Sequence, residues 1–149
     1  MVTLRDIDET NVESCAELKC LDEQCQFTNS PVWSLLQSAY THIKDKSKLY
    51  SIYADNTLVG MIRLDFTLHD GFYMFTNLLI DKDYQRKGYA QKAVYAALEI
   101  FRQDGRHKTV KIHVAYENAN AIHLYKKCGF TEADNYSEEN VFLTMKTEL

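Results

Sequence analysis

The fold is decided by one stretch of sequence, residues 72–101, which reads FYMFTNLLIDKDYQRKGYAQKAVYAALEIF. Residues 72–80 are apolar and rich in aromatic and branched side chains, which is typical of a buried strand. After a polar turn the period changes. From Ala90 to Phe101, apolar residues recur at i, i+3, i+4, i+7, i+8 and i+11, which predicts an amphipathic helix packed on a sheet.

The residues that follow predict a second strand beside the first. Gly105 is placed to end the helix in a left-handed cap, and apolar residues then alternate through residues 109–115 as in a strand. Because a helix connects them, we expect strands 72–80 and 109–115 to run parallel and to splay apart near Ile80. A last helix is expected from about Ala119 to Cys128, with the side-chain amide of Asn118 placed to cap it.

The remaining elements complete a mixed sheet. Ser30, as a cap, and Pro31, at the first helical position, predict a helix whose apolar stripe includes Leu36 and Tyr40. An earlier helix is expected from Thr10 or Asn11 to about Leu21. Further strands are expected at residues 3–6, 50–54 and 58–66, with a closing hairpin of residues 130–133 and 141–146 joined by a polar turn. These elements predict an α/β fold with a mixed sheet.

Composition limits the possible classes of protein. The chain has 149 residues, 46% of them hydrophobic, which is enough for one core and predicts a single domain over residues 1–149. The net charge of −4 argues against a nucleic-acid binder. Neither a membrane span nor a signal peptide is expected, so the cytoplasm is the expected compartment. The four cysteines lack metal-ligand spacing and are expected to be small core or surface residues, with no metal bound.

The turn at residues 85–90 can hold a pyrophosphate. The first backbone N–H groups of a helix are unpaired and carry partial positive charge, so anions bind there. Gly88 allows close approach of the backbone, Ala90 is small, and Arg86 and Lys87 can add positive charge. The segment matches neither the nucleotide P-loop nor the dinucleotide fingerprint. Taken alone, it could also be an ordinary strand-to-helix turn with solvated basic residues.

Two motifs resemble one enzyme family. Gln85-x-x-Gly88-x-Ala90 resembles the Q/R-x-x-G-x-G/A signature with which the GNAT superfamily of N-acetyltransferases binds the pyrophosphate of acetyl-CoA. Residues 118–130, NANAIHLYKKCGF, resemble that family's N-x-x-A-x-x-L-Y-x-x-x-G-F segment at every fixed position. The resemblance implies the GNAT acyl-CoA N-acyltransferase fold and extends over nearly the whole order of strands and helices.

The resemblance also implies a reaction and a set of site residues. A primary amine would attack the thioester of acetyl-CoA directly, without a covalent enzyme intermediate. Tyr125 corresponds to the tyrosine that protonates the leaving thiolate, although a core tyrosine is its alternative role. The backbone groups of Leu78 and Ile80 correspond to those that pair with pantetheine. The cofactor-binding residues implied are Leu78, Leu79, Ile80, Gln85, Arg86, Lys87, Gly88, Tyr89, Ala90, Asn118 and Tyr125.

The sequence indicates the general base and the acceptor-binding residues less clearly than the cofactor-binding ones. Many relatives carry a carboxylate on the strand equivalent to residues 72–80, and this chain has none there. Asp22, Glu23 and Asp65 are candidates for the general base, and for each a solvated surface carboxylate is the alternative. We expect Asp22, Glu23 and Thr76 to bind the acceptor.

A narrower resemblance concerns the bacterial spermine/spermidine acetyltransferases. It rests on residues 22–24, DEQ, together with Phe27, Ser30 and the later residues 79–81, LID, before the first motif. Those relatives carry W-x-D-R where this chain has residues 74–77, MFTN. The sequence thus favours a small amine or polyamine as acceptor and leaves open a protein lysine or N-terminal acetyltransferase and a non-catalytic acetyl-CoA-binding module. A homodimer is one assembly to expect.

Overall fold

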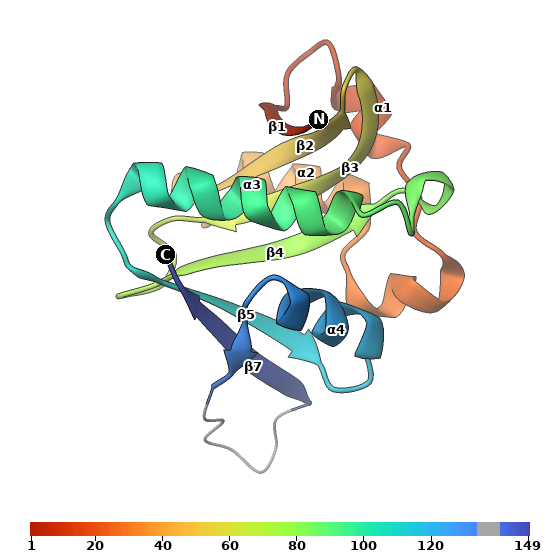
Figure 1. The fold of residues 1–149 in the computed structure, drawn as a ribbon. Helices are drawn as coiled ribbons and strands as arrows, with labels where there is room; N and C mark the ends of the chain where they lie inside the picture. Colours follow the sequence, from red (N-terminus) through yellow and green to blue (C-terminus); the bar gives the residue numbers. More distant parts are fainter. Residues whose placement is uncertain (134–140) are drawn as a thin grey trace.

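The sheet is built outward from two parallel strands, β4 (Tyr73–Ile80) and β5 (Thr109–Ala115), which the helix α3 (Tyr89–Asp104) connects. The computed structural model describes residues 1–133 and 141–149. In this part of the chain, β4 and β5 pair only at Tyr73 with Val110 and at Met74 with Lys111. Beyond these pairs the strands diverge, as Figure 1 shows. The expected parallel, splayed pair is confirmed.

The other strands extend the sheet in both directions. Among the described residues, one mixed sheet has the order β1-β2-β3-β4-β5-β7-β6. Three antiparallel strands precede β4, and β5 pairs with an antiparallel strand that in turn pairs with a short one. Their bounds are β1 (Val2–Asp6), β2 (Ser47–Ala54), β3 (Thr57–Asp65), β6 (Thr131–Glu132) and β7 (Phe142–Glu148). The mixed α/β sheet is confirmed, and the expected polar turn at residues 134–140 lies outside the described residues.

A β-bulge bends β4 where it leaves β5. Met61 pairs with Leu79 and Arg63 with Thr76, so β4 has one residue more than β3 in this interval. Asn77 within it has a φ of 51°, a left-handed conformation that asparagine adopts more readily than most residues. A bulge bends its strand and increases the local twist. It therefore helps to open the sheet between β4 and β5.

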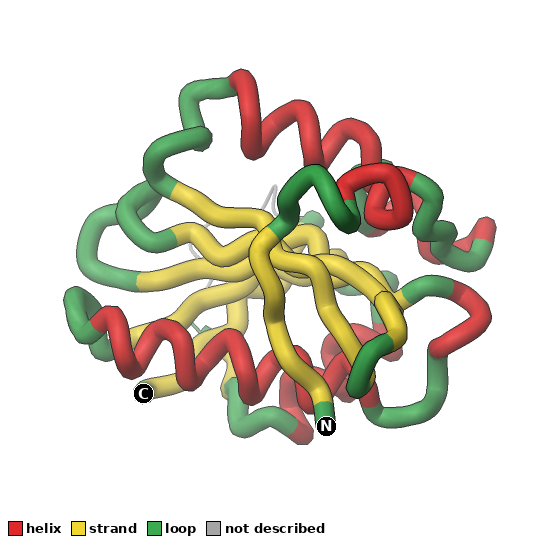
Figure 2. The backbone as a smooth tube through the Cα atoms, turned by 90° about the horizontal axis from the view of Figure 1, so that it is seen from above, coloured by secondary structure: helices red, strands yellow, loops and turns green. Residues whose placement is uncertain are grey.

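Helices cover both faces of the sheet, as Figures 1 and 2 show. On one face, α3 lies beside α4 (Ala119–Lys127); on the other lie α1 (Val12–Ala16) and α2 (Pro31–Tyr40). The predicted face of α3 is buried in the main core, where Phe101 stacks on Tyr73 with ring centroids 4.4 Å apart. No helix of the described residues has the length and apolar character needed to cross a membrane.

Three predicted helix caps are confirmed. The Ser30 hydroxyl accepts a hydrogen bond from the Trp33 N–H at 3.2 Å at the start of α2. Asn118 Oδ1 accepts one from the Ala121 N–H, also at 3.2 Å, at the start of α4. Gly105 ends α3 with a φ of 71°. Local hydrogen bonding thus sets these boundaries, and they could be read from the sequence.

The first helix, α1, is shorter than expected. It ends at Ala16 and not near Leu21, because the backbone that follows forms hydrogen bonds with a distant segment of the chain. The Lys19 N–H donates to Asp81 Oδ2, and the Lys19 carbonyl accepts from the Lys82 N–H, both at 2.8 Å. Beyond this tether the chain forms a 3₁₀ helix, η1 (Asp22–Phe27). A second 3₁₀ turn, η2 (Lys82–Tyr84), follows β4.

The expected apolar stripe of α2 was also wrong in part. Leu36 and Tyr40 are 45% and 83% exposed, whereas Pro31 and Ser34 are buried. Ser34 can be buried because its hydroxyl donates to the Ser30 carbonyl at 3.1 Å. The helix therefore turns a face with a small, internally bonded residue toward the sheet, which hydrophobic spacing alone could not indicate.

Gly60 tests how tightly β3 and β4 approach one another beside the bulge. A Cβ atom at this position would lie 2.1 Å from the Leu79 carbonyl oxygen. Because backbone must move to accept it, we expect Gly60→Ala to lower the free energy of unfolding by about 1–3 kcal/mol. Urea denaturation would measure this loss. The control is Thr57→Ala at an exposed position of the same strand; equal unfolding midpoints for both variants would contradict the prediction.

Candidate active site

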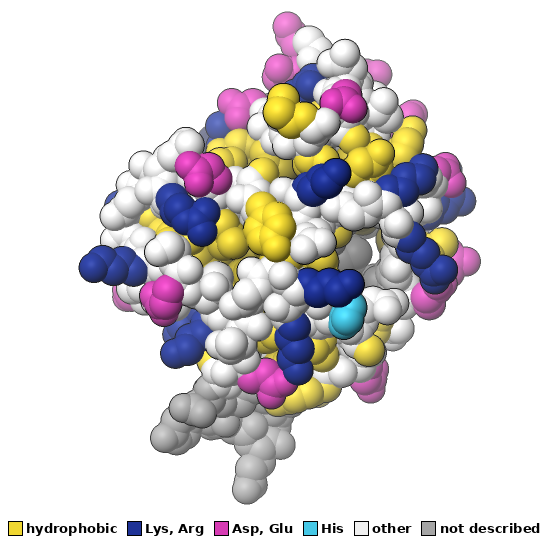
Figure 3. Space-filling view, in the orientation of Figure 1, with side chains coloured by type: hydrophobic (Ala, Val, Ile, Leu, Met, Phe, Trp, Pro, Cys, Tyr) yellow, Lys and Arg dark blue, Asp and Glu magenta, His cyan; other side chains and the backbone are white. Residues whose placement is uncertain are grey.

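The divergence of β4 and β5 opens a cleft of about 1220 Å³. Both strands line it, together with η1, the start of α3 and one side of α4. Figure 3 shows the surface hollowed between the start of α3 and α4, with Lys and Arg side chains gathered around that hollow. The cleft thus passes between the two strands and joins both faces of the sheet.

Most of the residues that the sequence singled out meet in this cleft. Those that line it are Glu23, Thr76, Leu78, Leu79, Ile80, Gln85, Arg86, Gly88, Tyr89, Ala90, Asn118 and Tyr125. Two others lie outside it. The Lys87 amine donates to the Asp83 carbonyl at 3.2 Å, and Asp22 lines a smaller neighbouring pocket.

The start of α3 is suited to an anion. Gly88 precedes the helix with a φ of 77° and has no side chain to cap the first N–H groups. A Cβ atom built on Gly88 would meet no atom within 4 Å, so the space beside these N–H groups is open. Arg86 also has a positive φ, 60°, a conformation that costs an arginine about 1–3 kcal/mol. With Arg86 and Lys127 in the cleft wall, this end fits the phosphates of a CoA molecule.

The side chain of Gln85 holds the anion-binding turn in place. Its Nε2 donates to the Ile80 carbonyl at 2.9 Å and to Gln24 Oε1 at 2.7 Å, while Gln24 Nε2 donates back to Gln85 Oε1 at 3.0 Å. This reciprocal amide pair joins the turn before α3 to η1, across 61 residues of sequence. Sequence reasoning missed Gln24 because nothing local marks it as the partner.

Tyr125 stands at the other end of the α4 wall. Its ring packs edge-on against Phe75, 5.7 Å between centroids, and tilts against Phe130 at 6.0 Å. Its hydroxyl has no hydrogen-bond partner among the described residues. Burial raises the pKa of Tyr125 above its usual value. The phenol is therefore protonated at neutral pH and has a proton to donate into the cleft.

Three buried polar atoms in the cleft wall lack partners among the residues the structure describes. They are Thr28 Oγ1, Thr76 Oγ1 and Asn77 Nδ2. A buried polar group without a hydrogen bond is costly, so such groups at a cleft suit a ligand that completes their bonding. Sequence reasoning named Thr76 and missed Thr28 and Asn77. The signal for Asn77 was present, since a polar pair interrupts an otherwise apolar strand.

Asp65 is not a base at this cleft, which corrects one expectation. Its side chain is 1% exposed and paired with Arg63, whose Nε lies 2.9 Å from Asp65 Oδ1. Burial raises the pKa of Asp65, and Arg63 opposes that shift. Asp65 does not line the cleft. Its ion pair stabilises the far end of β3, and Gln37 links that pair to Asn29 in the cleft wall.

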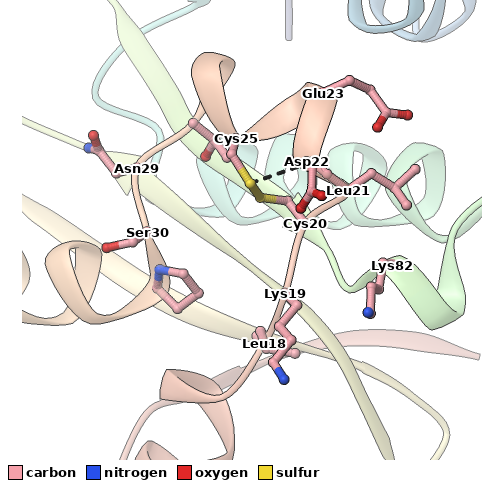
Figure 4. A pocket seen from close by; sticks show the side chains of 12 residues that line it. Leu18, Lys19, Cys20, Leu21, Asp22, Glu23, Cys25, Asn29, Ser30 and Lys82 are labelled. Carbon is pink, nitrogen blue, oxygen red and sulfur yellow. Dashed lines mark hydrogen bonds between the residues drawn. A yellow bond between two sulfur atoms is a disulfide. The ribbon is translucent and has the colours of Figure 1, made fainter.

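A second pocket of about 500 Å³ adjoins the cleft beside η1 (Figure 4). Glu23 lines both cavities, whereas Asp22 and Lys82 line only the smaller one. Cys20 and Cys25 form a disulfide here, whereas small core or surface residues were expected at both positions. The two cysteines lie where the chain has left α1, which ends at Ala16, and forms η1.

A comparison with known protein families shows the family of this chain. A model described as the Acetyltransferase (GNAT) family matches residues 12–130. The chain belongs to this family. The match confirms the resemblance carried by the motifs at residues 85–90 and 118–130, and with it the GNAT fold.

Individual relatives refine this placement. Spermidine N(1)-acetyltransferase of Vibrio cholerae is 32% identical over 101 residues, which are 66% of this chain and 58% of that protein. The solved spermidine N-acetyltransferase of Vibrio cholerae with CoA and spermine has a TM-score of 0.76 at 21% identity, covering 99% of this chain and 95% of its own. The ribosomal-protein-S18-alanine N-acetyltransferase of Escherichia coli has a TM-score of 0.71 at 19% identity, with 99% and 94% covered.

A third solved structure is an aminoglycoside acetyltransferase in complex with coenzyme A. Its TM-score is 0.79 at 18% identity, and the match covers 99% of this chain and 95% of the other. The three solved neighbours act on different acceptors according to their names, so the shared fold leaves the acceptor undecided.

Gly88 offers a test of the anion-binding end. Gly88→Asp should weaken CoA binding by about tenfold or more, because a carboxylate would occupy the open space at the helix N-terminus and repel phosphate. Isothermal titration calorimetry would measure the change. Gly105→Asp is the matched control, since it places the same residue at a φ of 71° at the opposite end of α3. Equal CoA affinity in both variants would contradict the assignment.

Proposed function

We propose that this chain is an acetyl-CoA-dependent N-acetyltransferase that acetylates a primary amine of a small molecule, with polyamines as the first class. The observation that carries the proposal is the protonated Tyr125 hydroxyl, without a hydrogen-bond partner among the described residues, in the cleft of a GNAT-family chain. A module that only bound acetyl-CoA would need no proton donor there. The placement of Tyr125 therefore favours catalysis over binding alone.

Different residues of the cleft would bind different parts of acetyl-CoA. Acetyl-CoA, when bound, supplies the acetyl thioester. The N–H groups at the start of α3, with Arg86 and Lys127, would hold its phosphates. Past Met74, the edge of β4 that faces β5 has no strand partner among the described residues, so its backbone at Leu78 and Ile80 is available to the pantetheine arm. Asn118, which caps α4, lies in the wall on the opposite side.

Tyr125 would act where negative charge develops. As the C–S bond breaks, its hydroxyl donates a proton to the sulfur atom, and its raised pKa keeps that proton in place beforehand. Phe75 and Phe130 fix the plane of the ring. The family resemblance assigned the same role to Tyr125 from sequence, and the aromatic packing supports it.

Two carboxylates in the cleft wall, the negative net charge of the chain, and the activity named for one relative support a polyamine as acceptor. The carboxylates of Glu23 and Glu117 line the cleft, and the chain as a whole carries a net charge of −4, so a cationic acceptor is attracted to it. The curated relative at 32% identity is a spermidine acetyltransferase by name. Against this, β4 lacks a carboxylate at residues 74–77. A protein N-terminal acetyltransferase is the second candidate, because one such enzyme shares the fold.

An amine panel tests the acceptor class. Spermidine and spermine should be acetylated with a higher kcat/KM than peptides bearing an N-terminal alanine or a lysine, since the further ammonium groups of a slender polyamine can approach Glu23 and Glu117 in the cleft wall. Thiol release from acetyl-CoA would measure each rate. A preference for either peptide would contradict the polyamine assignment while leaving the acetyltransferase assignment intact.

The role of Tyr125 has its own test. Tyr125→Phe should lower kcat by about 10²–10⁴-fold with little change in the KM for acetyl-CoA, because the hydroxyl is needed when the thiolate forms. Single-turnover kinetics would measure the chemical step, and matched melting temperatures would establish that the fold is kept. Tyr40→Phe, at a residue that is 83% exposed and outside the cleft, is the control. A wild-type rate in Tyr125→Phe would mean that Tyr125 only packs.

A further inference from the structure

His113 lies where an acceptor amine would enter between the two diverging strands. The parallel register pairs Tyr73 with Val110 and Met74 with Lys111. Continued by two residues, this register sets His113 opposite Thr76, at the point where the strands have just parted. Both residues line the cleft.

The two side chains share one face of the sheet. Val110, Ile112 and Val114 are buried in the main core beneath α3, so His113, which alternates with them, points to the other face. Thr76 likewise follows Phe75, which is buried in that core. His113 and Thr76 therefore face the side of α1 and α2. Tyr125 reaches the cleft from α4, on the opposite face.

A cross-strand partner orients the imidazole. His113 pairs with Thr144 of β7, and His113 Nδ1 lies 3.1 Å from Thr144 Oγ1. A hydroxyl can donate or accept, so this contact fits both tautomers of the neutral ring. In the tautomer in which Nδ1–H donates to Thr144 Oγ1, the Nε2 atom carries the lone pair and can accept a proton. The contact with Thr144 thus orients the ring and leaves Nε2 to the cleft.

The surroundings favour the neutral ring. His113 is an exposed residue of β5, and the partial desolvation of its ring lowers its pKa, an effect that the nearby His69 and Lys111 reinforce. His69 belongs to the connection between β3 and β4, Lys111 to β5 itself, and Thr144 on β7 is uncharged. These are the ionisable groups that act on His113 among the described residues. His113 is therefore mostly unprotonated at neutral pH.

We infer that His113 is the general base that removes the proton from the attacking amine nitrogen. This inference rests on the proposed function and supplies the group that β4 lacks. Glu23 and Glu117 also line the cleft, but they lie on η1 and beyond the end of β5. Neither lies at the point where the strands part, opposite Thr76.

The proton balance of the reaction requires such a group. The acceptor enters as an ammonium ion with three protons on nitrogen and leaves as an amide with one. The C–N bond forms with the nitrogen lone pair, the C–S bond breaks, and the electron pair passes to sulfur. The nitrogen therefore gives up two protons. His113 Nε2 accepts each of them in turn and passes it to solvent, while Tyr125 protonates the sulfur atom and regains its own proton from solvent. One proton is released overall.

The test compares pH profiles. His113→Asn keeps an amide near Thr144 but lacks the Nε2 base, and we expect its kcat/KM for spermidine at pH 7.5 to fall by about 10²–10⁴-fold. The deficit should shrink as the pH approaches the pKa of the amine, because more acceptor is then already deprotonated. A variant with only a structural defect would show the same deficit at every pH. His42→Asn, at an exposed position outside the cleft, is the control and should match the wild type.

The outcomes separate this inference from the proposed function. Wild-type turnover with a pH-independent loss, or no loss, in His113→Asn overturns the assignment of the base alone. The same holds if Glu23→Gln shows the pH-dependent loss and His113→Asn does not. If the wild-type protein acetylates no amine of the panel, both the proposed function and the base assignment are overturned. A loss that recovers with pH only in His113→Asn supports the inference.

Discussion

The parting of β4 from β5 is the constraint on which the rest of this structure depends. The strands share only two residue pairs among the described residues, and the bulge at Asn77 bends β4 away from β5. Two consequences follow together. The edges of both strands become available to an extended ligand. The cleft between them also connects the two faces of the sheet, which a continuous sheet would separate. A fully paired sheet with the same helices would have no such cleft.

Long-range polar contacts hold the segments that border this opening. Asp81 binds the backbone of Lys19, and Gln85 exchanges two hydrogen bonds with Gln24. Both contacts join the N-terminal region to the connection between β4 and α3. The segment that contains η1 and the acidic residue Glu23 is therefore positioned by the same loop that would bind the phosphates. Hydrogen bonds thus join the segment at the acceptor end of the cleft to the loop at its cofactor end.

The two groups proposed to move protons enter the cleft from opposite faces. Tyr125 is carried by α4, and burial raises its pKa, whereas His113 is carried by β5, and partial desolvation together with His69 and Lys111 lowers its pKa. Their environments push one pKa up and the other down, as acid and base catalysis require. A sheet opened between its two central parallel strands allows this arrangement, because each side of the opening can supply one group.

The sequence by itself determined the elements set by local periodicity and capping: the strand at residues 72–80, the buried stripe of α3, the caps at Ser30, Gly105 and Asn118, and the family motifs at residues 85–90 and 118–130. Only the tertiary structure decided the end of α1 at Ala16, the exposed side of α2, the Cys20–Cys25 disulfide, the burial of Asp65 and the place of His113 in the cleft. The physical reason is distance along the chain. Helix periods and caps depend on contacts within four residues, whereas these features depend on hydrogen bonds and strand registers between segments that folding alone brings together.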